Sequence, residues 1–595
     1  MTATNASTVA GYLRAPGKNG TSGWRLGVLA LAIVSLGCVL VWRLAMLQVV
    51  EPELYVEHGE SQRIRSSPLL AQRGGIFDRN DVELAVSTPR PSIWADPRLI
   101  SDPEAVAAAI VSVTGVDYDR LVTRLSNEDA KFAWMARQLD DETAERVLAL
   151  GIEGLYSLDE QARITPSGGV ARGILGRTNV EGEAVSGLEA LYNDVLTGTD
   201  GREIVERGLV ASDGESVTIP DGRYELVPSQ PGDALVLTID RTVQFEVEQI
   251  LLDGVHAAGA DHGTAIVSRP ATGEILAMAT VSATSDGGVV VSTDNRAVTA
   301  MFEPGSISKP LAVAALLEDG LVSESTTVEV TDEIEIYDAV FTDEIRHEQD
   351  VLSVGQVLEN SSNVGMAMLS ERLGKQRMHD YLGSYGIGDS TQLQFSGEQA
   401  GQLQPLDQWS GVSLPSTAIG YGYAATPLQM LRAYNVFANG GVLVEPHVVG
   451  RIESAVSGQI IETAPESRRV LSEQTANRIS GMLADVVAEG TGHLASVPGY
   501  EIAGKTGTAR LAQPNGGYTD ENGDVHLLTS FAGYLPASNP ELSIIVMIED
   551  PAGDASGGRL AAPLFGQISN FALQHFRIPP AASIDDADND AFESQ

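Results

Sequence analysis

Residues 303–317 constrain the fold most, because they read as a tight turn that leads straight into an apolar helix. Pro304 and Gly305 form the turn, and the apolar residues after it recur at helical spacing, which predicts a helix with one buried face. Ser306 and Lys309 stand three residues apart, so their side chains share a face of the first turn. A lysine whose pKa is lowered by burial can take the proton of a serine hydroxyl, and a helix N-terminus favours a developing oxyanion. The pair therefore predicts an activated serine.

Two more short motifs follow in order along the chain. They are Ser-x-Asn, with Ser361 and Asn363, and Lys-Thr-Gly-Thr, with Lys505, Thr506, Gly507 and Thr508. Only five of the 38 basic residues are lysines, yet two of them, Lys309 and Lys505, occupy the lysine positions of the three motifs. Coincidence is therefore a poor explanation. The order of the three motifs resembles the signature of penicillin-binding proteins and serine β-lactamases.

Charge and cysteine content bear on partners and compartment. The formal charge of −42 argues against nucleic acid or an acidic membrane surface as a partner. The many acids and few lysines fit a saline habitat or high-GC coding equally well. Cys38 is the single cysteine, so no intrachain disulfide forms. The nine histidines show no metal-ligand spacing, and we expect neither a metal nor a cofactor.

The N-terminal part predicts one membrane anchor. Residues 26–42 carry no charge, and the apolar run continues beyond Arg43, which can snorkel. A cleaved signal peptide is the alternative, but no small-x-small cleavage site follows closely, which favours an uncleaved helix over 24–47. Basic residues precede the run and acidic residues follow it, so 1–23 form a cytoplasmic tail and the chain after the helix lies outside.

Residues 60–230 mix short strands and helices and predict a separate α+β domain. Four of its segments combine glycines with charged residues, namely 73–80, 163–166, 173–176 and 187–198. We interpret these segments as turns whose charged groups pair with one another, and not as a second active site.

Residues 233–577 predict another α+β domain. Strands are expected at 234–240, 264–268, 274–280, 530–535 and 542–549, and helices at 243–252 and 564–576. Strands at both ends of the segment indicate a sheet that these ends complete. The 505–508 motif would then lie on a strand beside the Ser306 helix, with the polar loop 512–525 bordering the site. Residues 578–595 are acidic and rich in Pro and Ala, which predicts a disordered tail.

The exported part of the chain resembles a class B penicillin-binding protein. Residues 73–80 resemble the first pedestal motif of that family, and 187–189 resemble a later one. Residues 419–422 and 426–429 resemble the branch that acts in cell division, the FtsI type. The resemblance implies a penicillin-binding, serine β-lactamase-like transpeptidase domain, preceded by an elongated α+β pedestal domain and one N-terminal transmembrane helix.

The same resemblance implies the catalytic roles. Ser306 attacks the carbonyl of the penultimate D-Ala of a peptidoglycan stem peptide, and Lys309 takes the hydroxyl proton. Ser361 relays a proton towards the leaving amine. The backbone N–H groups of Ser306 and Thr508 form the oxyanion hole. A diamine side chain of a neighbouring stem then attacks the acyl-enzyme, which gives a cross-link.

Substrate-binding roles follow in the same way. Asn363 hydrogen-bonds the amide of the substrate. Lys505 and the hydroxyls of Thr506 and Thr508 hold its carboxylate end, because a carboxylate needs a cation and hydroxyl donors. Gly507 lets the strand backbone approach closely.

The resemblance also implies partners and a location. The partners are stem peptides that end in D-Ala-D-Ala, β-lactam antibiotics, an FtsW-like glycan polymerase and other division proteins, without nucleic acid. The protein would cross the cytoplasmic membrane once, with its catalytic domain in the periplasm at the division septum.

Other functions are compatible with the motifs. They are an elongation-type class B transpeptidase, a D,D-carboxypeptidase or β-lactamase that uses water as acceptor, and a non-catalytic β-lactam-binding scaffold. The pedestal and the anchor favour the transpeptidase over the hydrolases, and the presence of both motif lysines argues against the scaffold.

Overall fold

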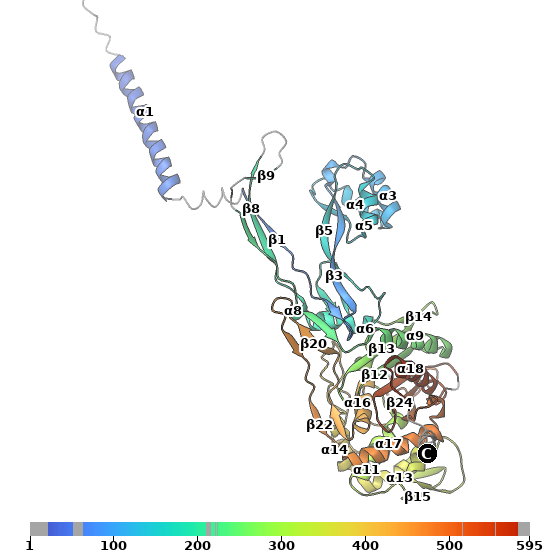
Figure 1. Cartoon of the computed structure of the whole chain (residues 1–595). Helices are drawn as coiled ribbons and strands as arrows, with labels where there is room; N and C mark the ends of the chain where they lie inside the picture. Colours follow the sequence, from blue (N-terminus) through green and yellow to red (C-terminus); the bar gives the residue numbers. More distant parts are fainter. Residues whose placement is uncertain are drawn as a thin grey trace, which may run out of the picture. The chain divides into compact units, whose positions relative to one another are not determined.

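Figure 1 shows the computed structural model of the chain, which describes residues 22–50, 63–209, 216–219, 222, 224–513, 516–553 and 555–580. Residues 1–21 of the predicted cytoplasmic tail and 581–595 of the predicted acidic tail lie outside these ranges. The chain forms two units, Met1–Leu69 with Asp200–Pro228 and Leu70–Thr199 with Ser229–Gln595.

The first unit contains a long apolar helix and a small antiparallel sheet. α1 (Ser22–Ala45) continues into a π-helical turn, and Gly23–Gln48 is long and apolar enough to cross a membrane. The core helix of a soluble domain would be mostly buried, whereas the apolar window of this helix is 0% buried inside the protein. The apolar helix predicted here is therefore present and available as an anchor. The sheet has the order β1-β8-β10 with β9 on β8, and these strands are Ile64–Leu69, Gly201–Leu209, Tyr224–Val227 and Ser216–Thr218.

The second unit has a seven-stranded sheet that joins segments far apart in the sequence. Its order is β21-β20-β11-β2-β3-β4 with β5 also on β3, and the strands are Ile460–Glu462, Val449–Glu453, Ala234–Leu237, Ile76–Phe77, Glu83–Ala95, Ala133–Ala136 and Leu155–Ile164. The strand predicted at 234–240 is thus shorter, and it lies in this sheet and not beside the 505–508 motif. It ends early because Asp240 caps the next helix, where its carboxylate accepts N–H bonds from Thr242 and Val243 at 3.0 and 3.1 Å.

Three helices cover one face of β3, β4 and β5. They are α3 (Pro103–Thr114), α4 (Tyr118–Leu125) and α5 (Asp141–Leu148), and each begins after an aspartate whose carboxylate accepts a backbone N–H bond. Their buried side chains pack against Ile93 and Met135 of the strands.

The charged residues of the predicted turns pair with one another, as expected. Arg73 and Arg163 each donate from Nε to a different oxygen of Glu189, both at 2.6 Å. The Glu189 side chain is 2% exposed, so loss of either arginine would leave a buried charge poorly compensated.

A six-stranded antiparallel sheet forms the centre of the segment that carries the three motifs. Its order is β14-β13-β12-β25-β24-β23, and the strands are Val289–Val291, Ile275–Ala283, His262–Ser268, Leu542–Glu549, Leu527–Leu535 and Ala503–Arg510. The strands predicted at 264–268, 274–280, 530–535 and 542–549 are therefore present, as β12, β13, β24 and β25. The helices predicted at 243–252 and 564–576 are α9 (Arg241–Ala258) and α18 (Ala561–His575).

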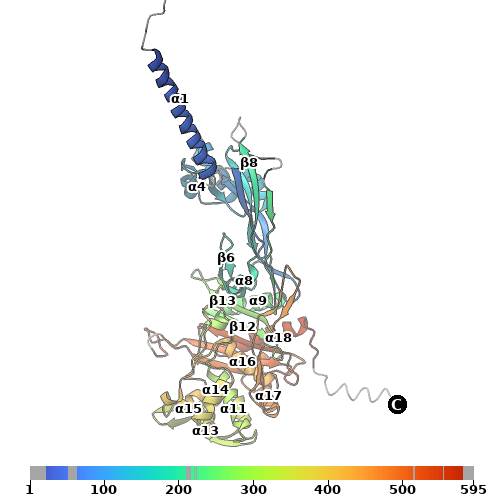
Figure 2. The same ribbon diagram turned by 90° about the vertical axis from the view of Figure 1, so that its left-hand side faces the viewer.

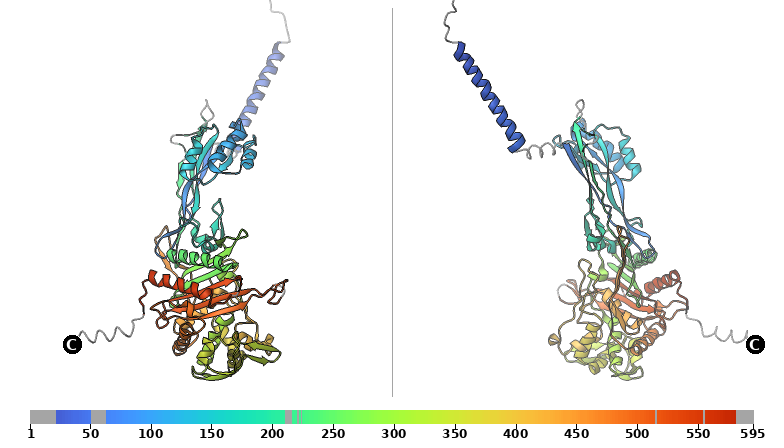
Figure 3. Two further views of the ribbon diagram at one scale, coloured as in Figure 1. Left: turned by 90° about the vertical axis from the view of Figure 1, so that its right-hand side faces the viewer. Right: turned by 60° about the vertical axis from the view of Figure 1, so that its left-hand side comes forward.

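Helices cover both faces of this sheet. Along β25, Ile544, Val546 and Ile548 pack towards α9 and α18, whereas Ile545 and Met547 pack towards α11 (Lys309–Glu318), α16 (Pro427–Ala438) and α17 (Glu473–Ala488). Successive side chains of a strand point to opposite faces, so a continuous apolar run serves two cores. Figure 2 shows the resulting layers, with α9 and α16 on opposite sides of β12, and Figure 3 shows them from two further sides.

Short elements complete the second unit. The helices are α6 (Arg172–Leu175), α7 (Gly187–Leu191), α8 (Asn193–Leu196), α10 (Arg296–Thr299), α12 (Val354–Glu359), α13 (Asn363–Leu373), α14 (Lys375–Ser384) and α15 (Ser413–Ala418). The strands are β6 (Arg177–Thr178), β7 (Ala184–Ser186), β15 (Thr327–Val330), β16 (Glu333–Ile336), β17 (Ala339–Thr342), β18 (Asp350–Ser353), β19 (Val442–Val444) and β22 (Ser467–Arg469).

Candidate active site

Ser306 lies in a 3₁₀ turn, Gly305–Ser308, that runs directly into α11. The sequence predicts one buried face for this helix, but the structure buries every residue from Lys309 to Leu317. The prediction was too narrow because α11 is apolar all round, which is the pattern of a helix enclosed by others. The serine is therefore mounted on a rigid element at the centre of the fold.

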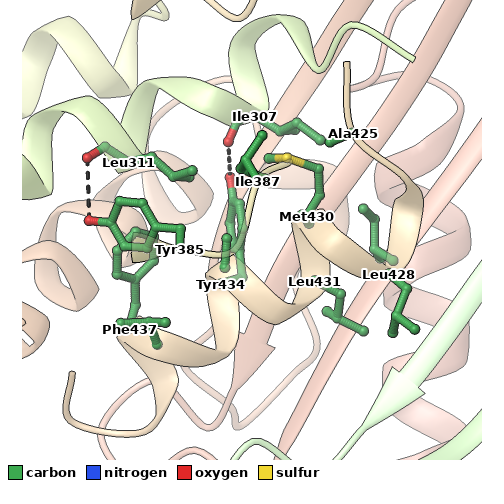
Figure 4. Close-up of a cluster of buried hydrophobic side chains, with 14 of the residues drawn as sticks. Ile307, Leu311, Tyr385, Ile387, Ala425, Leu428, Met430, Leu431, Tyr434 and Phe437 are labelled. Carbon is green, nitrogen blue, oxygen red and sulfur yellow. Dashed lines mark hydrogen bonds between the residues drawn. The ribbon is translucent and has the colours of Figure 1, made fainter. Parts of the chain in front are cut away.

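Two tyrosines, one within α16 and one directly after α14, hold the backbone around Ser306. Tyr434 of α16 donates its hydroxyl to the Ile307 carbonyl at 2.8 Å, and Tyr385 donates to the Leu311 carbonyl at 3.4 Å (Figure 4). Both tyrosines are fully buried, and their rings pack against Phe437. Neither was singled out from the sequence, because aromatic residues at helical spacing normally indicate only a core.

The turn before Ser306 requires glycine at two positions. Gly305 has φ = 57°, in the left-handed region, and its N–H donates to the Gly420 carbonyl at 3.0 Å. A Cβ atom on Gly420 would lie 2.0 Å from the Gly305 carbonyl oxygen. The loop at Gly420 therefore braces the turn, which gives a structural reason for that glycine.

The Lys309 amine connects the first two motifs. It donates to the carbonyl of Ser361, to the Ser361 hydroxyl at 3.2 Å and to Asn363 Oδ1 at 2.7 Å. Burial is the main cause that holds the pKa of Lys309 well below its ordinary value, and the charge of Lys505 adds to the effect. Among the described residues, the half-buried Ser306 side chain has no hydrogen-bond partner, so its hydroxyl is available for an incoming group.

Asp343 holds the loop that carries Ser361 and Asn363. Its carboxylate accepts the Ser362 hydroxyl at 2.7 Å and the backbone N–H groups of Asn363 and Val364 at 2.6 and 2.9 Å. These N–H groups begin α13, where a carboxylate is favoured. Ser361 itself has φ = 58°, so the loop is held in a conformation that a serine rarely adopts. Sequence reasoning missed Asp343, because nothing local connects it to a motif 18 residues away.

The third motif lies on β23, at the edge of the six-stranded sheet. Lys505 Nζ donates to the Thr506 carbonyl and to Thr506 Oγ1, both at 3.2 Å, and the Thr506 and Thr491 hydroxyls are 2.9 Å apart. Burial lowers the pKa of Lys505 to about 7, although the charge of Glu344 opposes the shift. Lys505 is thus a cation that titrates close to neutral pH.

Gly507 brings β23 against the Ser306 turn. A Cβ atom at this position would lie 3.0 Å from Ile307 Cγ2 and 2.4 Å from Ser530 Oγ. Thr508 Oγ1 accepts the Gly557 N–H at 3.1 Å. The structure therefore places all three motifs around one centre. No two of them lie on the same helix or strand.

Residues 516–525 of the predicted polar loop border this centre. Tyr518 donates its hydroxyl to Glu303 Oε2 at 2.6 Å, while Glu303 Oε1 accepts the Gly422 N–H at 2.7 Å. The ring of Tyr518 contacts Tyr421 edge-on, with centroids 6.0 Å apart. Within the described part of the chain, no group of three or more His, Cys, Asp or Glu side chains is placed to hold a metal ion.

Comparison with known proteins identifies the family. The penicillin binding protein transpeptidase domain matches residues 263–570, and the penicillin-binding protein dimerisation domain matches residues 68–237. The chain belongs to the penicillin-binding protein family. The resemblance on which the sequence interpretation rests is thereby confirmed, and so is the α+β fold class with its pedestal and apolar helix.

Individual penicillin-binding proteins are similar over nearly the full length. The peptidoglycan D,D-transpeptidase FtsI of Escherichia coli is 31% identical over 94% of this chain and 93% of its own. The penicillin-binding protein PbpB of Mycobacterium tuberculosis is 34% identical over 88% of this chain and 82% of its own. The crystal structure of penicillin-binding protein 3 from M. tuberculosis in complex with aztreonam has a TM-score of 0.66 at 29% identity, over 87% of this chain and 98% of the other.

Proposed function

We propose that this protein is a peptidoglycan D,D-transpeptidase that cross-links stem peptides through an acyl-enzyme on Ser306. The observation that carries the proposal is the buried Lys309 amine, which lies three residues from Ser306 and within 3.2 Å of the Ser361 hydroxyl. Its lowered pKa increases the share of the amine that is neutral at a given pH, and a neutral amine can accept a proton. The names of the similar proteins point to the same activity.

In the acylation step, the Ser306 oxygen attacks the carbonyl carbon of the penultimate D-Ala, and Lys309 takes the hydroxyl proton. The oxyanion accepts hydrogen bonds from the N–H groups of Ser306 and Thr508, and loss of one such donor commonly costs about 3 kcal/mol. The peptide C–N bond then breaks. The terminal D-Ala leaves as its amine receives a proton through Ser361, and an ester on Ser306 remains.

The substrate is held by both flanking motifs. Asn363 bonds the amide of the donor stem, and Lys505 with Thr506 and Thr508 binds the terminal carboxylate. In the second step the amine of a neighbouring stem attacks the ester, which releases Ser306 and forms the cross-link. The chain needs no metal for either step, because the charges that develop are met by lysines and backbone N–H groups.

We further propose a septal role for the enzyme, with α1 as a single membrane anchor. The basic N-terminal tail then lies in the cytoplasm and the catalytic segment in the periplasm. We assign 60–230 to the pedestal and 233–577 to the transpeptidase domain. The resemblance to the FtsI type leads us to propose an FtsW-like glycan polymerase and other division proteins as partners.

Transfer to an amine separates the candidate functions. Full-length protein in detergent is incubated with a pentapeptide that ends in D-Ala-D-Ala, with and without a D-amino acid as acceptor. We expect D-Ala release together with an exchanged peptide, and neither product from Ser306→Ala. Release of D-Ala without exchange would indicate a carboxypeptidase. No release from folded protein that still binds β-lactams would indicate the scaffold.

A further inference from the structure

We propose that a cavity beside the start of β3 and the end of β5 binds a small anion that carries two or more carboxylate or phosphate groups. The cavity has a volume of about 740 Å³ and lies among β5, α6 and the β6–β7 hairpin, with Thr293 on a further side. Pockets of this size hold ligands of a few hundred daltons. This inference concerns a second site and does not depend on the chemistry at Ser306.

The charge around the cavity is opposite to that of the chain as a whole. The protein has 80 acidic and 38 basic residues, yet three arginines line this one cavity, namely Arg163, Arg172 and Arg177. Glu189 is the only acidic residue among the described residues that line it. Both oxygens of Glu189 are already occupied, one by Arg163 and one by Arg73 at 2.6 Å each. The lining therefore keeps an excess of positive charge.

The guanidinium groups also have unused donors. The Arg163 side chain is 8% exposed, and its Nη2 atom is buried without an acceptor. A buried donor without a partner is costly, and a ligand oxygen at the Arg163 Nη2 atom would remove this cost. In the described part of the chain, the exposed side chains of Arg172 and Arg177 make neither a hydrogen bond nor an ion pair.

Glu248 is a further carboxylate on which the charge of Arg172 acts, and it does not cancel this excess. Its Oε1 accepts the Ala171 N–H at 2.9 Å and the Gln244 amide at 2.8 Å. Burial raises the pKa of Glu248, although the charge of Arg172 and these hydrogen bonds oppose the shift. Glu248 is thus engaged inside the protein, and Arg172 remains available to a ligand.

The other lining groups fit an anionic ligand. Thr165, Thr178 and Ser186 supply hydroxyl donors at the cavity. A planar guanidinium pairs with two oxygens of one carboxylate or phosphate, and three guanidiniums around a cavity match a polyanion better than a single charge. Carboxylate ligands and phosphate ligands share this chemistry, so both are tested.

The test is calorimetric titration of the full-length protein in detergent at low salt, with pyrophosphate as the phosphate probe and tricarballylate as the carboxylate probe. We expect one-to-one binding of at least one probe with a Kd below about 1 mM, weakened by added NaCl. Binding of pyrophosphate alone identifies a phosphate site, and binding of tricarballylate alone identifies a carboxylate site. If neither binds below about 10 mM, the proposal is wrong.

Matched variants place the binding in this cavity. Arg172→Gln combined with Arg177→Gln should weaken binding at least about tenfold, since each arginine donates charge-assisted hydrogen bonds. The control replaces two exposed arginines on the helices α4 and α5, Arg120→Gln with Arg146→Gln, which removes the same charge and should change the Kd less than about twofold. Equal weakening by both pairs would show a general charge effect and overturn the site. Arg172→Gln also removes a positive charge that favours the ionised form of Glu248, so the ligand-free melting temperature is measured for each variant. The Arg177 side chain makes neither a hydrogen bond nor an ion pair in the described chain, so Arg177→Gln alone should weaken binding without lowering that temperature, and it serves if the pair does not fold.

Discussion

Replacement of Asp343 by alanine should slow acylation of Ser306 without any direct contact to the substrate. The carboxylate receives one hydroxyl and two backbone N–H groups from the loop of Ser361 and Asn363. Alanine leaves the N–H groups of Asn363 and Val364 without an acceptor at the start of α13. The loop then loses the support that keeps Asn363 Oδ1 and the Ser361 hydroxyl on the Lys309 amine.

The size of the effect follows from these bonds. Hydrogen bonds to a charged group contribute about 1.5–3 kcal/mol each, and losses within one loop are not additive. We expect a loss of about 3 kcal/mol in unfolding free energy for Asp343→Ala. If between half and nearly all of this free energy is added to the barrier of acylation, the acylation rate falls about tenfold to a hundredfold. Asp343→Asn keeps one acceptor oxygen for the N–H groups, so its defect should be smaller.

The assay is the second-order rate of labelling by a fluorescent penicillin, measured across pH. Asp343 partly opposes the effect of burial on Lys309, because its negative charge raises the pKa of that amine. Its loss should therefore lower the pKa of Lys309 further, and the acid limb of the rate profile should move to lower pH in Asp343→Asn. A merely structural defect would lower the rate without moving this limb.

The control is Asp338→Ala, in the exposed turn between β16 and β17, where the described chain offers the carboxylate no partner. It should acylate at the rate of the unmodified protein. If Asp343→Ala also labels within about twofold of that rate, the loop does not depend on this carboxylate and the reasoning is refuted.

Four further outcomes follow from the structure. His347 donates hydrogen bonds to the Glu348 carbonyl and to Asp343, and these bonds, chiefly the first, raise the pKa of His347 above the ordinary 6.5. The stability that protonated His347 contributes is therefore full below pH 6.5 and is lost as the pH rises through the raised pKa. His347→Ala should lower the melting temperature at pH 5.5 and not at pH 8.5. Because burial lowers the pKa of Lys505 to about 7, affinity for a carboxylate-bearing β-lactam should weaken above that pH. Glu344 raises the pKa of Lys505, so in inhibitor titrations over a pH series Glu344→Gln should shift this loss of affinity to lower pH. Gly507→Ala places a Cβ 2.4 Å from Ser530 Oγ and should destabilise the protein by about 1–3 kcal/mol in denaturant melts, with partial recovery in Gly507→Ala/Ser530→Ala; no recovery would show that the clash lies elsewhere. Exchange of α1 for an unrelated apolar helix should abolish septal localisation or division in cells, and normal division would contradict a specific role for the helix.

Local sequence patterns predicted several secondary-structure elements of the second unit. The spacing of apolar residues and the residues at the ends of each element predicted β12, β13 and α9, because these signals lie within a few residues of one another. The arrangement of the expected strands predicted that the 505–508 motif lies beside the Ser306 helix, and the spacing of Ser306 and Lys309 put both on its first turn. The role of Lys505 in holding a carboxylate was expected only through the family resemblance.

Long-range pairing could not be read from the sequence. β11 was assigned to the wrong sheet, because its apolar residues fit any buried strand and only tertiary contacts select β2 and β20 as neighbours. The carboxylate of Asp343 is one of 80 acidic side chains, and its role depends on the β17–α13 contact. The same holds for Tyr434, whose hydroxyl reaches a carbonyl 127 residues away.

The most direct test of the central claim is intact-protein mass spectrometry of the full-length protein with benzylpenicillin, followed over hours beside Ser306→Ala. The account predicts a single long-lived adduct, which peptide fragmentation places on Ser306, and no adduct on the variant. An adduct that clears within seconds would identify a hydrolase. An adduct that persists in Ser306→Ala would contradict the assignment of the nucleophile.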